Sequence, residues 1–434
     1  MTRWIGQWSL LSGPVPVVVV VLGVFAAAWL VLRRDPHHLT RTVPLLVLGA
    51  GLAVGVLAFL VQRVWRPFPD PVPLSVYTWV GLGLLAVLLA VPRLRHGRGV
   101  SSRVLTVLAA LTVVLTASSQ VNIFFRAFPT VATALGDPPG HQVSFGSVRG
   151  PDATLVTGSP LDRVWAAPAT MPAAGVVSQV PIPGSVSGFA ARHAEVYLPP
   201  AYLSTPRARL PVLVLLAGQP GAPTDWVTLG GLALVMDAYA AQHAGLAPVV
   251  IMPDATGALL ANPLCLDSAL GNVDTYLSVD VPAWITSHLQ VSTDPAQWAI
   301  AGLSYGGTCS LQLAVNHPGV YPTFLDISGQ RAPTLGDHAR TVAAAFGGDE
   351  AKFDAVNPLD VLARERFPRS HGVFVVGAAD TAYKPQAQQV FAAARAADMQ
   401  VRYREVPGGH DYQAWRQGLV GNLGWLGTRL GLTA

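Results

Sequence analysis

Four long apolar stretches near the N-terminus constrain the fold of this chain more than any other feature. They run over residues 15–32, 43–62, 75–92 and 104–121, and none carries a charge in its middle. Each is close to the roughly 20 residues that a helix needs to cross a bilayer core about 30 Å thick. A cleaved secretory signal would leave one short apolar run, and the alternative is a buried helical core in a soluble protein. We therefore expect a four-span transmembrane region over residues 1–121.

Charged residues are scarce, and their distribution is uneven. They make up 12% of the 434 residues, about half the share in soluble globular chains, which excludes a disordered or nucleic-acid-binding chain. Residues 1–121 contain ten arginines against two acidic residues, whereas the remainder has 18 basic and 22 acidic residues. Because the arginines cluster between the apolar stretches, the pattern is typical of membrane topology rather than of a polyanion partner.

The arginines also predict the orientation of the spans. Cytoplasmic loops are enriched in Lys and Arg, and the loops after the first and third spans are richer in Arg than the loop after the second. Both termini, and everything after about residue 122, should then lie outside a bacterial plasma membrane. We expect the spans to act as an anchor, with partner assembly or lipid access as alternatives. The arginines of the two basic loops are Arg33, Arg34 and Arg41, and Arg93, Arg95, Arg98 and Arg103.

From residue 176 onward, short apolar segments alternate with helical patterns. This alternation predicts an α/β fold over 176–434, with a mostly parallel sheet covered by helices on both faces. Residues 122–175 are rich in Pro, Gly, Ala and Thr and are predicted to be an extracytoplasmic linker. The predicted strands are 176–182, 193–198, 211–217, 248–252, 297–302, 372–377 and 400–406, and the predicted helices are 229–244, 278–289, 306–317, 338–346, 384–397 and 411–429.

A G-x-S-x-G pentapeptide at residues 302–306 places Ser304 between a predicted strand and a predicted helix. A strand, a sharp turn with serine at its tip and a helix make up a nucleophile elbow. Glycines flank the serine because side chains there would clash across the tight turn, and the helix N-terminus favours negative charge that develops at the serine. We therefore predict that Ser304 is a nucleophile. The alternative is a Gly-rich turn whose serine only caps the helix.

A nucleophilic serine needs a base to take its proton and an acid to orient that base. After a nucleophile elbow, the chain order is acid and then histidine. His410 lies on a Gly-rich loop after the predicted strand 400–406, and Asp380 precedes it by 30 residues, just after the predicted strand 372–377. We predict that His410 is the base and Asp380 the acid. The less well placed candidates are His371, Asp360 and Asp411.

Two N–H donors must point at the oxyanion that such a reaction forms. The amide of Tyr305, directly after the serine, is predicted to be one of them. The second is expected from the loop after the predicted strand 211–217. Gln219 is the best placed residue there, because Pro220 has no N–H. An ordinary Gly/Pro turn is the alternative for this loop.

The only two cysteines of the chain, Cys265 and Cys309, lie in the part expected outside the membrane. An oxidising compartment favours their pairing. A bridge would stabilise the fold by roughly 2–4 kcal/mol and tie the loop 255–275 to the active site; two free core thiols are the alternative. No His/Cys group has zinc-site spacing and no Gly-rich loop is typical of phosphate binding, so we predict neither a metal nor a cofactor.

Four segments of the predicted α/β region carry a resemblance to a known family: 196–202, 216–221 with Trp226, 302–307, and 409–411 with Trp415. Through these segments, residues 176–430 resemble the putative esterase family of α/β hydrolases, which includes esterase D-type enzymes and the antigen 85 mycolyltransferases. The resemblance implies a Ser304–His410–Asp380 triad and a metal-free acyl-enzyme mechanism. The chain departs from the family's secreted members, which have cleaved signals, because it carries four predicted spans; soluble substrates such as glutathione thioesters are therefore not expected. Four further residues lie in stretches similar to the family and are expected to be structural or at the pocket edge: Asp254, Asp274, Tyr276 and Asp280.

These features together predict an outward-facing serine esterase, held in the membrane, that acts on lipid or cell-envelope esters. The main alternative is an acyltransferase that moves a fatty or mycolic chain onto an envelope glycan. The same triad would also serve a peptidase, and a membrane scaffold with a vestigial hydrolase domain is a candidate of a different class. The expected partners are the ester substrate and the bilayer, with no nucleic acid, and the oligomeric state does not follow from the sequence.

Overall fold

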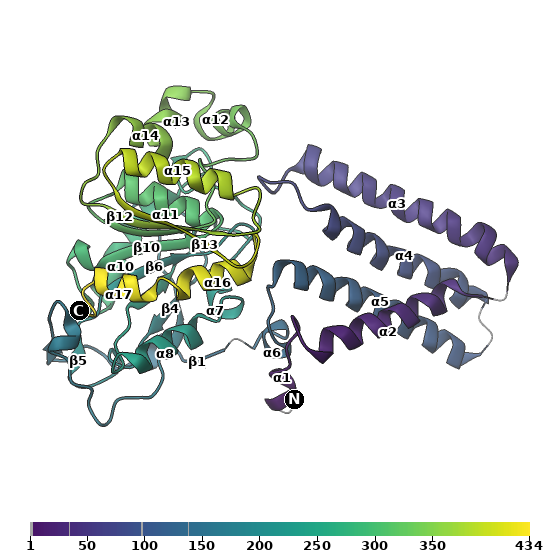
Figure 1. Ribbon diagram of the computed structural model, residues 1–434, viewed down its shortest axis with the longest axis horizontal. Coiled ribbons are helices and arrows are strands. Elements are labelled where there is room, and N and C mark those ends of the chain that lie inside the picture. Colours follow the sequence, from purple (N-terminus) through teal and green to yellow (C-terminus); the bar gives the residue numbers. More distant parts are fainter. Residues whose placement is uncertain (1–2, 34, 97–98, 138) are drawn as a thin grey trace. The chain divides into compact units, whose positions relative to one another are not determined.

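The computed structural model describes residues 3–33, 35–96, 99–137 and 139–434 (Figure 1). The chain divides into two compact units, Met1–Asp137 and Pro138–Ala434. The predicted linker, residues 122–175, is divided between these two units. Arg34 and Arg98, which contribute to the predicted orientation, lie outside the described residues.

Four long helices form the first unit. Each is long and apolar enough to cross a membrane, by length and composition. Short π-helical segments, His38–Thr42 and Leu60–Trp65, extend α3 at both of its ends. The long helices are α2 (Pro14–Val31), α3 (Val43–Phe59), α4 (Leu74–His96) and α5 (Val100–Phe125), and the unit also has the short helices α1 (Arg3–Gly6) and α6 (Val131–Ala134).

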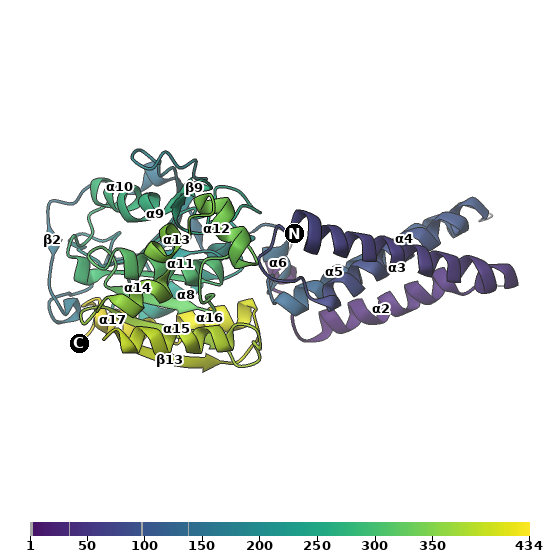
Figure 2. The same ribbon diagram turned by 90° about the horizontal axis from the view of Figure 1, so that it is seen from above.

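Close approach of small residues brings the long helices together. Helix α2 packs on α5, α5 on α4, and α4 on α3 (Figure 2). A Cβ atom added at Gly23 of α2 would lie 2.3 Å from Oγ1 of Thr116 on α5. The Thr116 hydroxyl donates to the Val19 carbonyl at 3.0 Å, and the Arg93 guanidinium of α4 donates to the Leu30 carbonyl at 3.1 Å. Backbone groups of α2 therefore take part in the contacts with both α5 and α4.

A nine-stranded sheet forms the centre of the second unit, in the order β1-β3-β4-β7-β6-β10-β11-β12-β13. The strands from β7 to β13 run parallel, and β4 is antiparallel to both of its neighbours. Its strands are β1 (His141–Gln142), β3 (Val176–Val180), β4 (Ala194–Leu198), β6 (Val212–Leu216), β7 (Val249–Met252), β10 (Trp298–Leu303), β11 (Thr323–Ile327), β12 (His371–Gly377) and β13 (Gln400–Val406). Two small sheets pair β2 (Leu155–Val156) with β5 (Arg207–Ala208), and β8 (Asp267–Ser268) with β9 (Gly271–Asn272).

Helices cover both faces of this sheet, which confirms the predicted α/β architecture. In Figure 1, α11, α14 and α15 lie above the central strands β10 and β6, and α8, α16 and α17 lie below these two strands. The helices of the second unit are α7 (Asp225–Thr228), α8 (Leu232–Gln242), α9 (Val273–Thr275), α10 (Val281–His288), α11 (Tyr305–Asn316), α12 (His338–Phe346), α13 (Glu350–Val356), α14 (Pro358–Arg364), α15 (Lys384–Ala396), α16 (Tyr412–Val420) and α17 (Leu423–Arg429).

Several elements differ from the prediction. The helices α7, α9, α13 and α14 and the short strands β1, β2, β5, β8 and β9 are not among the predicted elements. Two further differences have a clear cause. Strand β11 lies inside the sheet but is not among the predicted strands, because Asp326 interrupts its short apolar run. The predicted helix 411–429 is instead two helices, α16 and α17. Gly421 and Asn422 separate them, and the Asn422 side-chain amide donates to the Gly418 carbonyl at 2.7 Å. Glycine and asparagine are both poor helix formers, which accounts for the break.

The parallel strands bring distant segments to one edge of the sheet. Gly302 of β10 pairs with Leu216 of β6, and Gly377 of β12 pairs with Val406 of β13. Because β6, β10, β12 and β13 end at nearly the same level, the loops that follow them emerge at a common edge. Ligand sites of open parallel sheets lie at this carboxyl edge.

Candidate active site

Ser304 lies at the tip of a tight turn between β10 and α11. Its backbone has φ 52° and ψ −117°, a left-handed conformation that costs free energy for a residue with a side chain. A Cβ atom at Gly302 would lie 2.3 Å from the Gly306 carbonyl oxygen, and one at Gly306 would lie 2.5 Å from the Leu216 carbonyl oxygen. The Ser304 amide donates to the Ile327 carbonyl at 2.8 Å. The structure thus has the strand–turn–helix geometry that the pentapeptide predicts.

His410 and Asp380 lie next to this serine. The Nε2 atom of His410 is 2.9 Å from the Ser304 Oγ atom, and its Nδ1 atom is 2.9 Å from Oδ2 of Asp380. The Asp380 side chain is only 3% exposed, whereas that of His410 is 28% exposed. The three predicted residues, which are far apart in the sequence, therefore form one continuous chain of hydrogen bonds that ends in a buried carboxylate.

Aromatic rings hold the imidazole of His410 in place. The Tyr383 ring stacks on it, with centroids 3.9 Å apart, and the Trp415 ring meets it edge-on at 5.0 Å. The Tyr383 amide also donates to Oδ1 of Asp380 at 3.0 Å. Tyr383 is not among the predicted site residues. Its position three residues after Asp380 could have indicated it, because a backbone amide at that spacing can donate to the aspartate side chain. It orients both the acid and the histidine.

The less favoured candidates for the triad have other partners. Asp411 caps α16 by accepting from the Ala414 amide at 3.0 Å, and it also accepts from the Gly409 amide at 3.0 Å. Asp360 lies in the first turn of α14 and accepts from the Asn357 side chain at 2.6 Å. His371 begins β12 at the opposite end of that strand from Asp380. Burial lowers its pKa, and Arg429 lowers it further.

The two predicted oxyanion donors lie close to the serine. Tyr305 is the first residue of α11, where a backbone N–H has no partner within the helix. A Cβ atom at Gly218 would lie 3.6 Å from the Ser304 Cβ atom, so the loop after β6 borders the elbow. The Gln219 side chain donates to the Leu260 carbonyl at 3.0 Å, and the Gln219–Pro220 peptide is cis. The roles of the Tyr305 and Gln219 amides as oxyanion donors stay predictions.

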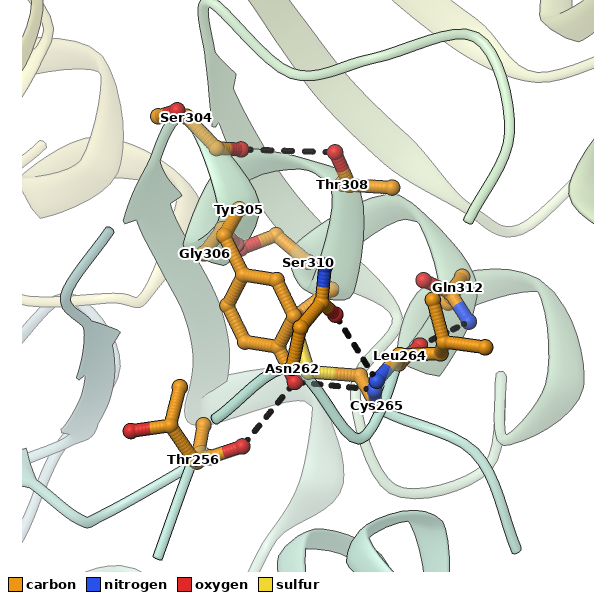
Figure 3. The surroundings of a disulfide bond; sticks show 12 residues. Thr256, Asn262, Leu264, Cys265, Ser304, Tyr305, Gly306, Thr308, Ser310 and Gln312 are labelled. Carbon is orange, nitrogen blue, oxygen red and sulfur yellow. Dashed lines mark hydrogen bonds between the residues drawn. A yellow bond between two sulfur atoms is a disulfide. The ribbon is translucent and has the colours of Figure 1, made fainter. Parts of the chain in front are cut away.

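A disulfide joins Cys265 to Cys309 on the elbow helix (Figure 3). The same loop is bound by the Tyr305 hydroxyl, which donates to the Ala255 carbonyl at 3.0 Å and accepts from the Cys265 amide at 3.0 Å. The Gln312 side chain donates to the Leu264 carbonyl at 3.1 Å. The loop 255–265 is therefore bound to the nucleophile helix by both covalent and hydrogen bonds.

A buried carboxyl group lies behind the elbow. A Cβ atom at Gly307 would lie 2.6 Å from Oδ1 of Asp326, and the Gly329 amide donates to this oxygen at 2.7 Å. The other oxygen, Oδ2, has no hydrogen-bond partner among the described residues. Burial raises the pKa of Asp326 to about 7, and the Gly329 bond opposes this shift. No motif or spacing in the sequence indicates this group.

The remaining residues of the resembling stretches, three aspartates and a tyrosine, bind neighbouring segments. Asp254 forms an ion pair with Arg192 at 2.7 Å, and Arg192 also donates to the Gly221 carbonyl at 3.0 Å. Asp280 accepts from the Val186 amide at 2.8 Å. These contacts fix the loops around the carboxyl edge. The other members are Asp274, which lies 2.5 Å from the His317 ring, and Tyr276, which donates to the Ile182 carbonyl at 3.3 Å.

Within the parts of the chain that the structure describes, no group of three His, Cys, Asp or Glu side chains could hold a metal ion. The expectation that the protein needs no cofactor is not tested by this observation and stays a prediction.

A mostly parallel sheet with a serine elbow after β10 and a histidine loop after β13 defines an α/β hydrolase. The chain belongs to the putative esterase family, whose sequence pattern matches residues 190–426. The predicted family and fold are thereby confirmed, and they support a hydrolase.

The chain is also similar to one relative along most of its length and to two solved structures along about three fifths of it. An uncharacterized protein of Corynebacterium glutamicum is 37% identical over 398 residues, which cover 89% of this chain and 90% of the relative. An S-formylglutathione hydrolase from Agrobacterium tumefaciens has a TM-score of 0.51 at 18% identity, over 60% of this chain and 98% of that one. MPT51 of Mycobacterium tuberculosis has a TM-score of 0.43 at 18% identity, over 59% of this chain and 97% of that one. The alignment with the Corynebacterium protein is too long to be confined to residues 138–434, so it also includes part of the first unit.

Proposed function

We propose that this protein is a membrane-anchored serine esterase that hydrolyses carboxylic esters, with Ser304 as the nucleophile. The observation that carries the proposal is the chain of hydrogen bonds at the carboxyl edge, in which His410 lies 2.9 Å from both Ser304 Oγ and Asp380 Oδ2. Membership of the esterase family supports the same reaction. A scaffold with a vestigial hydrolase domain would have no reason to keep this geometry.

The reaction follows from these positions. The Ser304 Oγ atom attacks the ester carbonyl carbon while its proton passes to Nε2 of His410. The carbonyl oxygen becomes an oxyanion that the amides of Tyr305 and Gln219 stabilise. The C–O bond to the alcohol then breaks, His410 donates its proton to the leaving oxygen, and an acyl-enzyme remains. Water then attacks the acyl carbon and gives a proton to Nε2 of His410. The bond between the acyl carbon and Ser304 Oγ breaks, His410 returns the proton to Oγ, and the carboxylic acid leaves.

Asp380 supports this cycle without exchanging a proton. Its buried carboxylate keeps the proton of His410 on Nδ1, so that Nε2 is free to accept the serine proton. It also stabilises the imidazolium that forms during the attack. The Tyr383 ring and amide hold the acid and the base together.

The anchor and its arginines support the proposed location and substrate. Four helices can cross a membrane, and Arg33 and Arg41 of the first loop, with Arg93, Arg95 and Arg103 around the third, favour cytoplasmic positions for these loops. The catalytic unit then lies outside the plasma membrane. Lipid and cell-envelope esters are the esters within reach of such an anchored enzyme, and they are the substrates we propose.

Acyl transfer is the second candidate. The same acyl-enzyme would pass its acyl group to a hydroxyl of an envelope glycan if such an acceptor reached Ser304 before water. The elbow and the triad would form the same acyl-enzyme in both reactions. The resemblance to a family that contains both esterases and mycolyltransferases is compatible with hydrolysis and with acyl transfer. Only the acceptor distinguishes them.

The full chain, purified in detergent micelles, tests the proposal with p-nitrophenyl acetate. We expect turnover that Ser304→Ala abolishes and that Ser287→Ala, a change at an exposed serine of α10, leaves unchanged. Equal turnover in the wild type and Ser304→Ala would overturn the proposal. Adding a trehalose or arabinose acceptor and measuring the acylated sugar by mass spectrometry against the free acid separates transfer from hydrolysis.

A further inference from the structure

The loop 255–265 is rigid on the side that faces the elbow helix. Tyr305, Cys309 and Gln312 lie at positions i, i+4 and i+7 of α11, and residues at this spacing share one face of a helix. Each of the three side chains binds the loop, as Figure 3 shows around the disulfide. A loop bound in this way has little freedom to repack its side chains.

The same loop is bound to the segment that borders the serine. The Gln219 side chain donates to the Leu260 carbonyl at 3.0 Å, and the Gly221 amide donates to the Leu259 carbonyl at 3.2 Å. Gly218 lies against Ser304 at the other end of this segment. Leu259 and Leu260 are thus hydrogen-bonded directly to the segment that borders the nucleophile.

Despite these bonds, the two leucines remain exposed. Leu259 is 59% exposed and Leu260 is 37% exposed, and the backbone carbonyls of both residues are held by the segment 219–221. An aromatic side chain lies against the start of the same loop, because a Cβ atom at Gly257 would lie 3.3 Å from the Phe189 ring. Adjacent exposed leucines on a fixed loop indicate a surface that an apolar group covers.

We propose that Leu259 and Leu260 bind the hydrocarbon chain of the acyl group of the substrate, so that the enzyme prefers long-chain acyl esters. This proposal rests on the proposed function and names its substrate class. Two observations select this occupant. The leucines bind the segment 219–221, which continues from Gly218 beside Ser304. Four helices of the chain are long and apolar enough to cross a bilayer, where esters carry long hydrocarbon chains. Each methylene that leaves water on binding favours the longer ester.

A chain-length series tests this proposal on the full chain in detergent micelles. The substrates are p-nitrophenyl acetate, butyrate and octanoate, each below the concentration at which it aggregates. We expect kcat/KM of the wild type to rise from acetate to octanoate. In the double variant Leu259→Ser, Leu260→Ser, kcat/KM for octanoate should fall about tenfold, while that for acetate stays within about twofold. Leu234→Ser, a change at another leucine that is 59% exposed, should keep the wild-type series.

Each other outcome overturns the proposal. An unchanged chain-length series in the double variant would mean that the leucines do not meet the acyl chain. An equal loss for acetate and octanoate would mean that the loop only supports the site. A loss seen solely with esters embedded in phosphatidylglycerol vesicles, and not with dissolved octanoate, would mean that the leucines meet the bilayer instead. Failure of the proposed function is distinguishable, because acetate turnover would then be absent or insensitive to Ser304→Ala.

Discussion

The two units of the chain bury different kinds of residue. In Met1–Asp137 large apolar side chains point outward, and Phe25 and Leu48 are each 70% exposed, whereas alanines such as Ala86 and Ala109 are buried. In Pro138–Ala434 the fully buried residues include Trp226, Tyr197 and Phe324. This is the difference expected between a unit surrounded by lipid and a unit surrounded by water. In lipid, helices associate through close approach of small residues, whereas in water the burial of large apolar side chains stabilises the fold.

Exchange of a single polar atom in the catalytic unit should change the rate of ester hydrolysis far more than a substitution in the helical unit. Asp380→Asn should lower kcat of ester hydrolysis by about 10³–10⁴-fold, because an amide no longer fixes the proton of His410 on Nδ1. Asp411→Asn is the matched control, since Asn caps a helix about as well as Asp. Similar rates for the two variants would contradict the assignment of Asp380.

The buried carboxyl group of Asp326 should give the catalytic unit a pH dependence of stability near neutrality. The folded-state pKa of Asp326 is about 7, above the ordinary value of 3.8. The stability from the protonated carboxyl is therefore complete below about pH 4 and is lost as the pH rises to about 7, by at most about 4 kcal/mol. Thermal melting of the full chain from pH 4 to pH 8 should show a smaller decline in Asp326→Asn. Parallel declines in the wild type and the variant would refute this role.

The two units should also respond differently to reduction. The disulfide closes a loop with a sequence separation of 44 residues, and both of its cysteines lie in the catalytic unit. Cys265→Ser with Cys309→Ser should lower the free energy of unfolding of that unit by about 2–4 kcal/mol. A reductant should lower the melting temperature of the wild type to that of the variant and leave the variant unchanged. A wild type that melts at the same temperature with and without reductant, after the thiols are shown to be free, would contradict this prediction.

Helix packing in the first unit gives the smallest expected effect. A valine at position 23 would clash with Thr116, because a Cβ atom there would lie 2.3 Å from the Thr116 Oγ1 atom. A Cβ atom at Gly55 would have no neighbour within 4 Å. Gly23→Val should therefore destabilise the contact between α2 and α5 by about 1–3 kcal/mol, and Gly55→Val should not. Proteolysis of the spans in micelles measures this difference, and ester hydrolysis should be equal in both variants. Equal protease resistance would indicate that α2 and α5 do not pack as described.

The sequence predicts those features that depend on local pattern. The four spans follow from uninterrupted apolar runs, and Ser304 follows from glycines that the tight turn requires. His410 and Asp380 could be found because the order of strands fixes which loops emerge at the carboxyl edge. Strand β11 could not be found in this way, since its buried Asp326 resembles a loop residue when only neighbours in sequence are considered.

Contacts between distant segments account for the rest of the site. The ion pair of Arg192 with Asp254 and the binding of Leu259 to Gly221 join loops that follow different strands. No periodicity or spacing encodes such contacts, because they depend on how the loops meet at the edge of the sheet. The stacking of Tyr383 on His410 belongs to the same class.

The proposed function requires an activated Ser304 on the outer side of the membrane. A membrane-impermeant fluorophosphonate probe reports on both properties when it is applied to intact cells and to lysed membranes, with the wild type beside Ser304→Ala. We expect labelling of the wild type on intact cells and none of the variant. Labelling only after lysis would contradict the orientation, and no labelling of the wild type in either sample would contradict the activated nucleophile.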